Sequence, residues 1–316
     1  MSNVKSRSIH RSILCSFAFI LGVLAGALAQ KTMGVGNILR AAGIPYPTSR
    51  ASSGPTVLPI VKIPAAYRGQ MLLFILAGQS NMVGWAPIRE DNRTDPRIFV
   101  FSNDYHWRMA SEPVDNAYNQ VDQISLDRFA FFGPSMAFAL ASLDRQPQII
   151  IGLIPCAKGS SAIAEWQRNP SDQSLYGSCL KRALAASPMG HMSGILFFQG
   201  ETDAQDPKRF PHPEPHPFEW AKLFTAFVAD LRQDLQDPDL PVVLAQLGSD
   251  PVSEDFPNWN IVKKQQSSLE LPMTAMITTD DLPLMDGLHF TADSYQIIGK
   301  RFADAYWDLV ERRPVK

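Results

Sequence analysis

Short apolar runs alternate with longer amphipathic stretches from about residue 71 onward. The run Met71–Ala77 has seven apolar residues, which is too short for a globular helix, and it stops at Gly78. This pattern is typical of a strand buried on both faces of a parallel sheet. Further strands are predicted over Arg97–Phe101, Gln148–Ile154, Gly194–Phe198, Pro241–Gln246 and Met273–Thr278.

Helices are predicted between these strands. Their ranges are Pro134–Leu143, Ser174–Ala186, Phe218–Leu235, 254–270 and Thr291–Val310. Strands that alternate with helices indicate right-handed βαβ units and one parallel sheet covered on both faces. The expected fold is therefore an α/β/α sandwich of three layers, with about five parallel strands. The polar and aromatic stretch Ser102–Phe132 has no clear period, and loops of this length are usually functional or disordered.

The N-terminal residues have the pattern of an export signal. Lys5, Arg7 and Arg11 precede the apolar stretch Ile13–Ala29, and Ala27-Leu28-Ala29 is a small-x-small cleavage pattern. We expect residues 1–29 to be a cleaved signal peptide, with secretion or periplasmic delivery as the consequence. An uncleaved membrane anchor is the alternative. Residues 30–66 are expected to form a flexible linker and residues 67–312 the folded domain.

Composition and charge narrow the functional class. Hydrophobic residues make up 45% of the 316-residue chain and charged residues 19%, as in an ordinary globular protein. Three of the 29 basic residues lie in residues 1–29, which leaves 26 against 31 acidic residues. This balance gives no electrostatic basis for binding nucleic acid. It does not determine the oligomeric state.

The cysteines fit an exported chain. Cys15 lies in the signal segment, which leaves Cys156 and Cys179 as an even pair. The expectation is a disulfide between them. The alternative is two buried thiols that pack as small apolar groups.

Small and polar residues follow three of the predicted strands, where α/β proteins place their ligands. Ser80 and Asn81 follow the first strand, and a serine in this place either caps the next helix or presents a nucleophile. The second strand is followed by Gly159, Ser160 and Ser161, and the third by Gln199, Gly200 and Glu201.

A serine nucleophile needs a base, and a third group usually orients that base. Of the six histidines, five lie in the signal segment, the long polar loop, a turn or the proline-rich loop 207–217. His289 instead lies in Asp286-Gly287-Leu288-His289, just before the last helix. The three-residue spacing lets one turn present a carboxylate and an imidazole to the same pocket. A surface turn is the alternative.

Three motifs together resemble the sialate O-acetylesterase-like domain, which is related to the acetylxylan esterases of carbohydrate esterase family 6 in the SGNH hydrolase superfamily. The motifs are Gly78-Gln79-Ser80-Asn81-Met82, Gln199-Gly200-Glu201-Thr202-Asp203 and Asp286-Gly287-Leu288-His289-Phe290-Thr291. Weaker matches occur at Trp107, Glu112-Pro113, Gly133-Pro134 and Glu165-Trp166, and the resemblance covers about Ile63–Val310.

The resemblance implies a flavodoxin-like SGNH fold and a serine esterase that uses no cofactor. It makes Ser80 the nucleophile, His289 the general base and Asp286 its orienting carboxylate. It also implies an oxyanion hole made of the backbone N–H groups of Ser80 and Gly159 and the side-chain amide of Gln199. Contacts with substrate are expected from Asn81, Trp107, Ser160 and Glu201.

One position departs from the family pattern. The family usually has Gly-Gly-Ser/Thr-Ser after the second strand, where this chain has Gly159-Ser160-Ser161-Ala162. A serine replaces that glycine without strain only if its φ is negative. The pattern therefore leaves open whether Gly159 or Ser160 supplies the backbone donor.

The expected substrate is an acetylated carbohydrate, with a sialic acid, xylan or another glycan as the carrier of the ester. The segments expected around Ser80 are polar or aromatic, and include Trp85, Asn103, Asp104, Tyr105 and Trp166. A general esterase or lipase and a non-catalytic carbohydrate-binding protein are the rival interpretations. A metal site is not expected, because the prolines around His212 and His216 favour an extended loop in which the imidazoles do not converge.

Overall fold

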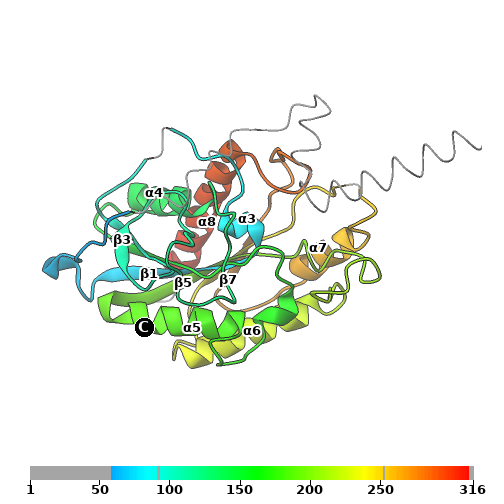
Figure 1. Cartoon of the computed structure of the whole chain (residues 1–316), viewed down its shortest axis with the longest axis horizontal. Helices are drawn as coiled ribbons and strands as arrows, with labels where there is room; N and C mark the ends of the chain where they lie inside the picture. The colour runs from blue at the N-terminus through cyan, green and yellow to red at the C-terminus, as the bar shows by residue number, and fades with distance from the viewer. Residues whose placement is uncertain (1–57, 91–92, 252, 313–316) are drawn as a thin grey trace, which may run out of the picture. The chain divides into compact units, whose positions relative to one another are not determined.

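The seven-stranded sheet is the centre of the fold. A computed structural model describes residues 58–90, 93–251 and 253–312, so the predicted signal segment and residues 30–57 of the predicted linker lie outside it. Figure 1 shows the sheet between two layers of helices. The strand order is β3-β2-β4-β1-β5-β6-β7, and only β3 runs antiparallel to its neighbour. The structure confirms the predicted α/β sandwich.

The strands have the following bounds: β1 Met71–Gly78, β2 Ile98–Phe101, β3 Trp107–Met109, β4 Ile150–Pro155, β5 Gly190–Phe198, β6 Val242–Ala245 and β7 Thr274–Ile277. All six predicted strands are present, and β5 begins four residues earlier than Gly194. The expectation of about five strands was too low. The pattern missed β3, which pairs antiparallel with β2 and lies within the polar stretch 102–132.

The helices cover both faces of the sheet. Their bounds are α3 Ser80–Val83, α4 Ser135–Arg145, α5 Leu175–Ala186, α6 Trp220–Asp234, α7 Trp259–Ser267 and α8 Ala292–Glu311. Short 3-10 turns lie at η1 Ala65–Tyr67, η2 Ile163–Trp166 and η3 Ser187–Met189. In Figure 1, α4 and α8 lie on one side of the sheet, and α5 and α6 on the other. The predicted helices are confirmed, although α7 is shorter than 254–270.

Strand β1 lies between β4 and β5 and is buried on both faces. Leu73 and Ile75 pack in the core under α5 and α6, whereas Phe74 and Leu76 pack in the core under α4 and α8. This alternation is the period-two geometry of a strand. Burying each such side chain contributes about 1.5–3 kcal/mol of transfer free energy. The chain crosses from one side of β1 to the other between β4 and β5, so β1 ends at a topological switch point.

Gly78 ends β1 because no side chain fits there. Its φ is +130°, and a Cβ atom would lie 2.1 Å from the carbonyl oxygen of Phe198 on β5. Gly78 therefore lets the chain turn sharply into α3 while β1 stays paired with β5.

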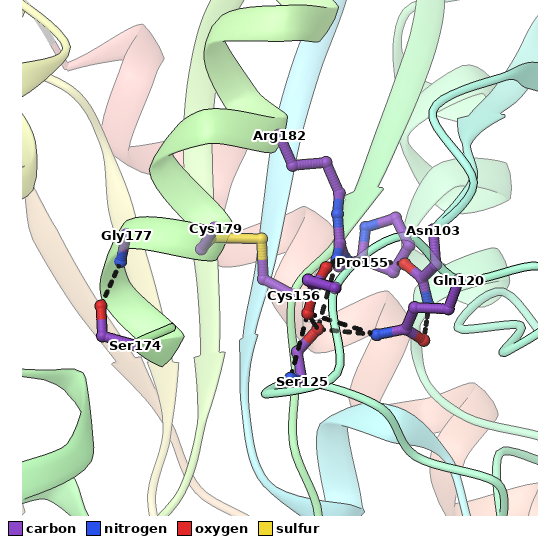
Figure 2. The surroundings of a disulfide bond; sticks show 10 residues. Asn103, Gln120, Ser125, Pro155, Cys156, Ser174, Gly177, Cys179 and Arg182 are labelled. Carbon is purple, nitrogen blue, oxygen red and sulfur yellow. Dashed lines mark hydrogen bonds and ion pairs between the residues drawn. A yellow bond between two sulfur atoms is a disulfide. The ribbon is translucent and has the colours of Figure 1, made fainter. Parts of the chain in front are cut away.

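A buried arginine orders the long polar stretch 102–132. Arg182 on α5 is 1% exposed; it donates to Asn103 Oδ1 at 2.7 Å and to the carbonyl oxygen of Pro155, and it pairs with Asp122. Figure 2 shows Asn103 and Ser125 of the stretch gathered around Arg182. A buried cation is tolerated only with such partners. The stretch is therefore held against α5.

The same region contains the predicted cysteine pair. The structure joins Cys156 after β4 to Cys179 on α5 by a disulfide, with Cα atoms 5.3 Å apart (Figure 2). This separation is well inside the limit of about 7 Å for such a bond. In the chain-entropy model, closing a loop of this length stabilises the fold by about 3 kcal/mol. The bond fastens the turn after β4 to α5.

The described end of the predicted linker contacts the domain. Val61 N–H donates to the carbonyl oxygen of Trp107 at 2.9 Å, and Ile63 is buried in the core. In the described residues, no helix is both long and apolar enough to cross a membrane.

Glu112, in the stretch 102–132, is a buried carboxyl group that the fold keeps from ionising easily. Burial raises its pKa to about 8, although nearby backbone N–H groups oppose the shift. Between the ordinary pKa of 4.5 and about 8, the folded chain therefore holds a proton that the unfolded chain has lost. The stability that Glu112 contributes is complete below about pH 4.5 and is lost as pH rises toward 8.

Glu112→Gln should remove this pH dependence, because an amide does not ionise. We expect the free energy of unfolding of the unaltered protein, minus that of the variant, to fall steadily between about pH 5 and pH 8. Denaturant unfolding at several pH values measures this difference. Glu270→Gln, at an exposed glutamate, is the control and should give a constant difference. A constant difference for Glu112→Gln would contradict the assignment of a buried, protonated carboxyl.

Candidate active site

The ends of β1, β4 and β5 meet at one edge of the sheet, and Ser80 lies there as the first residue of α3. The sharp turn at Gly78 and Gln79 brings the Ser80 hydroxyl into a cleft of about 380 Å³. The residues that line this cleft are Gln79, Ser80, Trp85, Asp127, Phe129, Lys158, Gly159, Ser160, Glu201, Thr202, Gln205, Phe256, Leu288 and His289. Five of the predicted site residues are thus brought together.

Ser80, His289 and Asp286 form a continuous hydrogen-bonded chain. His289 Nε2 lies 2.9 Å from Ser80 Oγ, and His289 Nδ1 lies 2.8 Å from Asp286 Oδ2. Asp286 Oδ1 also accepts the backbone N–H groups of Leu288 and His289, at 3.0 and 2.7 Å. Because Nδ1 faces a carboxylate, Nε2 is left to accept the serine proton. This is the geometry of an activated serine.

Burial and hydrogen bonding act in opposite directions on Asp286. Burial alone would raise its pKa, but the hydrogen bonds from the ring and the backbone of His289 outweigh it and lower the pKa. Asp286 is therefore a carboxylate at neutral pH, as orienting the imidazole requires. The turn itself is fixed by Met285 N–H, which donates to the carbonyl oxygen of His289 at 2.7 Å, and by Thr291, which caps α8.

Trp85 covers one face of the imidazole. The two rings are stacked, with centroids 4.6 Å apart and planes 19° from parallel. The Trp85 ring also packs near those of Phe129 and Phe131, with ring centroids 6.2 and 6.3 Å apart. An indole face stacked on an imidazole fixes the plane of the ring.

A layer of buried polar groups lies beneath the cleft. Asn81 is 1% exposed; its amide donates to Glu201 Oε1 and accepts from the Tyr295 hydroxyl at 2.6 Å. Burial raises the pKa of Glu201, opposed by the Asn81 hydrogen bond and by His289. Its other oxygen, Oε2, has no hydrogen-bond partner among the described residues. Glu201 lines the cleft as expected, whereas Asn81 supports it from below.

Two side chains that were predicted to act in the site, those of Gln199 and Trp107, lie outside the cleft. The Gln199 amide is fully buried and donates to Ser161 O at 2.9 Å and Asp203 Oδ2 at 2.6 Å. Both of its hydrogens are engaged, so it has none to offer an oxyanion. Trp107 packs against Phe101, with ring centroids 5.0 Å apart, and not in the cleft. The structure contradicts both placements.

Several aromatic and polar residues expected near Ser80 instead support the fold. Trp166 is fully buried and donates to Ser161 Oγ at 3.1 Å. Asn103 binds Arg182, and Asp104 forms an ion pair with Arg108. Sequence reasoning missed Asp127 and Phe129, which line the cleft from the stretch 102–132. That stretch has no periodic signal that could have placed them.

The described residues contain no group of three or more His, Cys, Asp or Glu side chains arranged to hold a metal ion. His212 and His216 lie in the proline-rich loop. The backbone N–H of His216 donates to Asp203 Oδ1 at 2.9 Å, which anchors this loop to the end of β5.

Comparisons with known proteins agree with this geometry. The model of a family described as carbohydrate esterase, sialic acid-specific acetylesterase, matches residues 70–308. A probable carbohydrate esterase from Arabidopsis thaliana is 30% identical over 254 residues, covering 74% of this chain and 89% of that protein. The crystal structure of an Arabidopsis thaliana protein covers 76% of this chain and 99% of its own, with 28% identity and a TM-score of 0.62.

Two more distant structures share the fold. A carbohydrate acetylesterase from Xanthomonas citri has a TM-score of 0.57 at 19% identity, covering 77% of this chain and 57% of its own. NanS has a TM-score of 0.59 at 16% identity, covering 78% of this chain and 99% of its own.

Fold and family together define a carboxylic ester hydrolase. The chain belongs to the carbohydrate esterase family of sialic acid-specific acetylesterases. It is an acetylesterase, and its substrates are acetylated carbohydrates.

Proposed function

We propose that the protein removes O-acetyl groups from a carbohydrate through an acetyl-enzyme on Ser80. The observation that carries the proposal is the chain of two hydrogen bonds from Ser80 through His289 to Asp286 at the edge of the cleft. A hydroxyl with an oriented base is what nucleophilic attack on an ester requires.

The reaction has two halves. Ser80 Oγ attacks the acetyl carbonyl carbon while His289 Nε2 takes the hydroxyl proton, and Asp286 stabilises the imidazolium. The tetrahedral intermediate collapses, and His289 returns the proton to the sugar oxygen as the C–O bond breaks. Water then attacks the acetyl-enzyme by the same route, and acetate leaves. Ser80 N–H, at the first position of α3 where no intrahelical partner exists, is one donor to the oxyanion.

The lining of the cleft supports a sugar as the alcohol. Phe129 and Phe256 offer aromatic faces, and Lys158, Ser160 and Gln205 offer polar groups. Sugar rings have apolar C–H faces and hydroxyl rims, which match this combination. A sialic acid, xylan or another glycan could carry the acetyl group. The intact hydrogen-bonded chain favours turnover over a binding protein that has lost catalysis.

We also propose that the protein is exported. The basic and apolar pattern of residues 1–29 motivates this, and the bond between Cys156 and Cys179 suits an oxidising compartment. A secreted or periplasmic protein fits both features.

Acyl-chain length separates an acetylesterase from a lipase of the same fold. A long acyl chain needs a continuous apolar trough, whereas the lining of the cleft interrupts its aromatic side chains with the polar ones of Asp127, Lys158 and Gln205. We expect kcat/KM to fall from acetyl to butyryl to octanoyl esters of one alcohol, by about 1–3 kcal/mol for each methylene that the pocket resists.

Initial-rate measurements on the three esters check this. Ser80→Ala is the control, and it should lose about 10³-fold or more in kcat on the acetyl ester. Octanoyl esters hydrolysed as fast as acetyl esters would show a lipase, and a Ser80→Ala variant with a tenth of the activity would exclude the serine mechanism.

Trp85 is expected to stabilise the imidazolium that forms during the reaction. A cation over an indole face is worth about 0.5–2 kcal/mol, so Trp85→Leu should lower kcat by about tenfold with little change in KM. Trp85→Phe keeps an aromatic face and should recover most of the rate. Steady-state kinetics on p-nitrophenyl acetate separates the two constants. A raised KM with unchanged kcat would make Trp85 a substrate contact instead.

A further inference from the structure

The turn that follows β4 is unusual at Ser160. Ser161 N–H donates to the carbonyl oxygen of Lys158 at 3.2 Å, so residues 158–161 form a β-turn with Gly159 and Ser160 at its centre. Ser160 has φ +60°, in the left-handed region that favours glycine. This is the position where the family pattern has its second glycine. Serine thus occupies a strained conformation, which costs about 1–2 kcal/mol, and the surrounding contacts must hold it.

Asp127 supplies one of these contacts. Its Oδ2 accepts Gly159 N–H at 2.9 Å, and its Oδ1 accepts Phe129 N–H at 3.0 Å. Asp127 is 7% exposed, so both bonds are largely shielded from water. The carboxylate therefore links the stretch 102–132 to the turn, across 32 residues of sequence.

Lys158 fastens the turn on its other side. Its ammonium donates to the carbonyl oxygen of Leu126 at 2.8 Å, and its backbone N–H donates to Gly78 O at 2.9 Å. Leu126 directly precedes Asp127, so the Lys158 ammonium and the Asp127 carboxylate link the turn to the same part of the stretch 102–132.

These contacts decide which N–H groups are free for catalysis. A Cβ atom on Gly159 would lie 2.5 Å from Asp127 Oδ2 and 4.0 Å from Ser80 Cβ, so the bond between Gly159 and Asp127 lies beside the nucleophile. Gly159 N–H is already donated to a carboxylate, and the Gln199 amide is engaged elsewhere. The turn's own hydrogen bond does not use Ser160 N–H, and Ser160 lines the cleft.

We propose that Asp127 is a positioning residue that clamps Gly159 N–H and thereby presents Ser160 N–H as the second oxyanion donor. The inference rests on the proposed serine mechanism. A donor fixed before the reaction needs no reorganisation when charge develops, which is where such groups gain their effect. The clamp also explains how serine is kept in a glycine conformation at this turn.

Asp127→Ala tests the clamp in the full-length protein. Loss of one oxyanion donor typically lowers kcat by about 10²–10³-fold, and we expect a fall of about 10²-fold on p-nitrophenyl acetate with KM within about threefold. Asp127→Asn keeps one acceptor oxygen for two N–H groups, so its kcat should lie between that of Asp127→Ala and that of the unaltered protein. Asp172→Ala, which removes an exposed carboxylate paired with Lys181, is the matched control and should not change the rate.

Inhibition by methylboronic acid gives a second readout. Its tetrahedral adduct on Ser80 imitates the intermediate, so Asp127→Ala should weaken inhibition by about the same factor as it lowers kcat/KM. In a crystal structure of the adduct, we expect a boronate oxygen within hydrogen-bonding distance of Ser160 N–H, with the bond from Gly159 to Asp127 retained.

Three outcomes would overturn the inference. An Asp127→Ala variant that is as fast as the unaltered protein would leave the clamp without a role. A faster variant would show that the carboxylate blocks the oxyanion site. A boronate oxygen bound to Gly159 N–H, with Asp127 displaced, would assign the donor to Gly159. Failure of the serine mechanism itself is recognised separately, because Ser80→Ala would then retain activity.

Discussion

The hydrogen bond between Ser80 and His289 joins residues 209 positions apart, and the rest of the site depends on it. Its Ser80 end is fixed by β1, which is buried between β4 and β5 and stops where Gly78 meets the backbone of β5. Its His289 end is fixed by the turn before α8, which packs on the face of the sheet covered by α4. The apolar core therefore positions two polar atoms within 2.9 Å, and any slip of β1 or α8 would separate them.

The polar groups around this bond are unusually well buried. Asn81, Glu201 and Tyr295 form a layer below the cleft, while Arg182 and its partners order the stretch that brings Asp127 and Phe129 to the rim. Burial raises the pKa of Glu201, as it does for Glu112 and Asp115, so these carboxyl groups ionise less readily in the fold than they would in water. Buried polar groups cost free energy unless they are hydrogen-bonded, and Asn81 is bonded to both Glu201 and Tyr295 below the cleft.

Much of the fold follows from local pattern. Strand β1 could be predicted because burial on both faces leaves an uninterrupted apolar run, and the α/β class follows from alternation. Strand β3 could not be predicted, because three residues at the edge of the sheet are too few to show a hydrophobic period. The catalytic residues could be proposed from motifs. The direction of the Gln199 side-chain amide and of the Gly159 backbone N–H could not, because it depends on hydrogen-bond partners that are distant in the sequence. Asp203 and Trp220 engage Gln199, and Asp127 reaches Gly159 from a stretch with no pattern at all.

Direct detection of the acetyl-enzyme tests the central claim. Rapid acid quenching during turnover of an activated acetyl ester, followed by proteolysis and mass spectrometry, should find one acetyl group on the peptide that contains Ser80. His289→Ala should leave that peptide unmodified under the same conditions, since the hydroxyl then lacks its base. An unmodified Ser80 peptide during rapid turnover, or an acetyl group carried on a different residue, would contradict the mechanism.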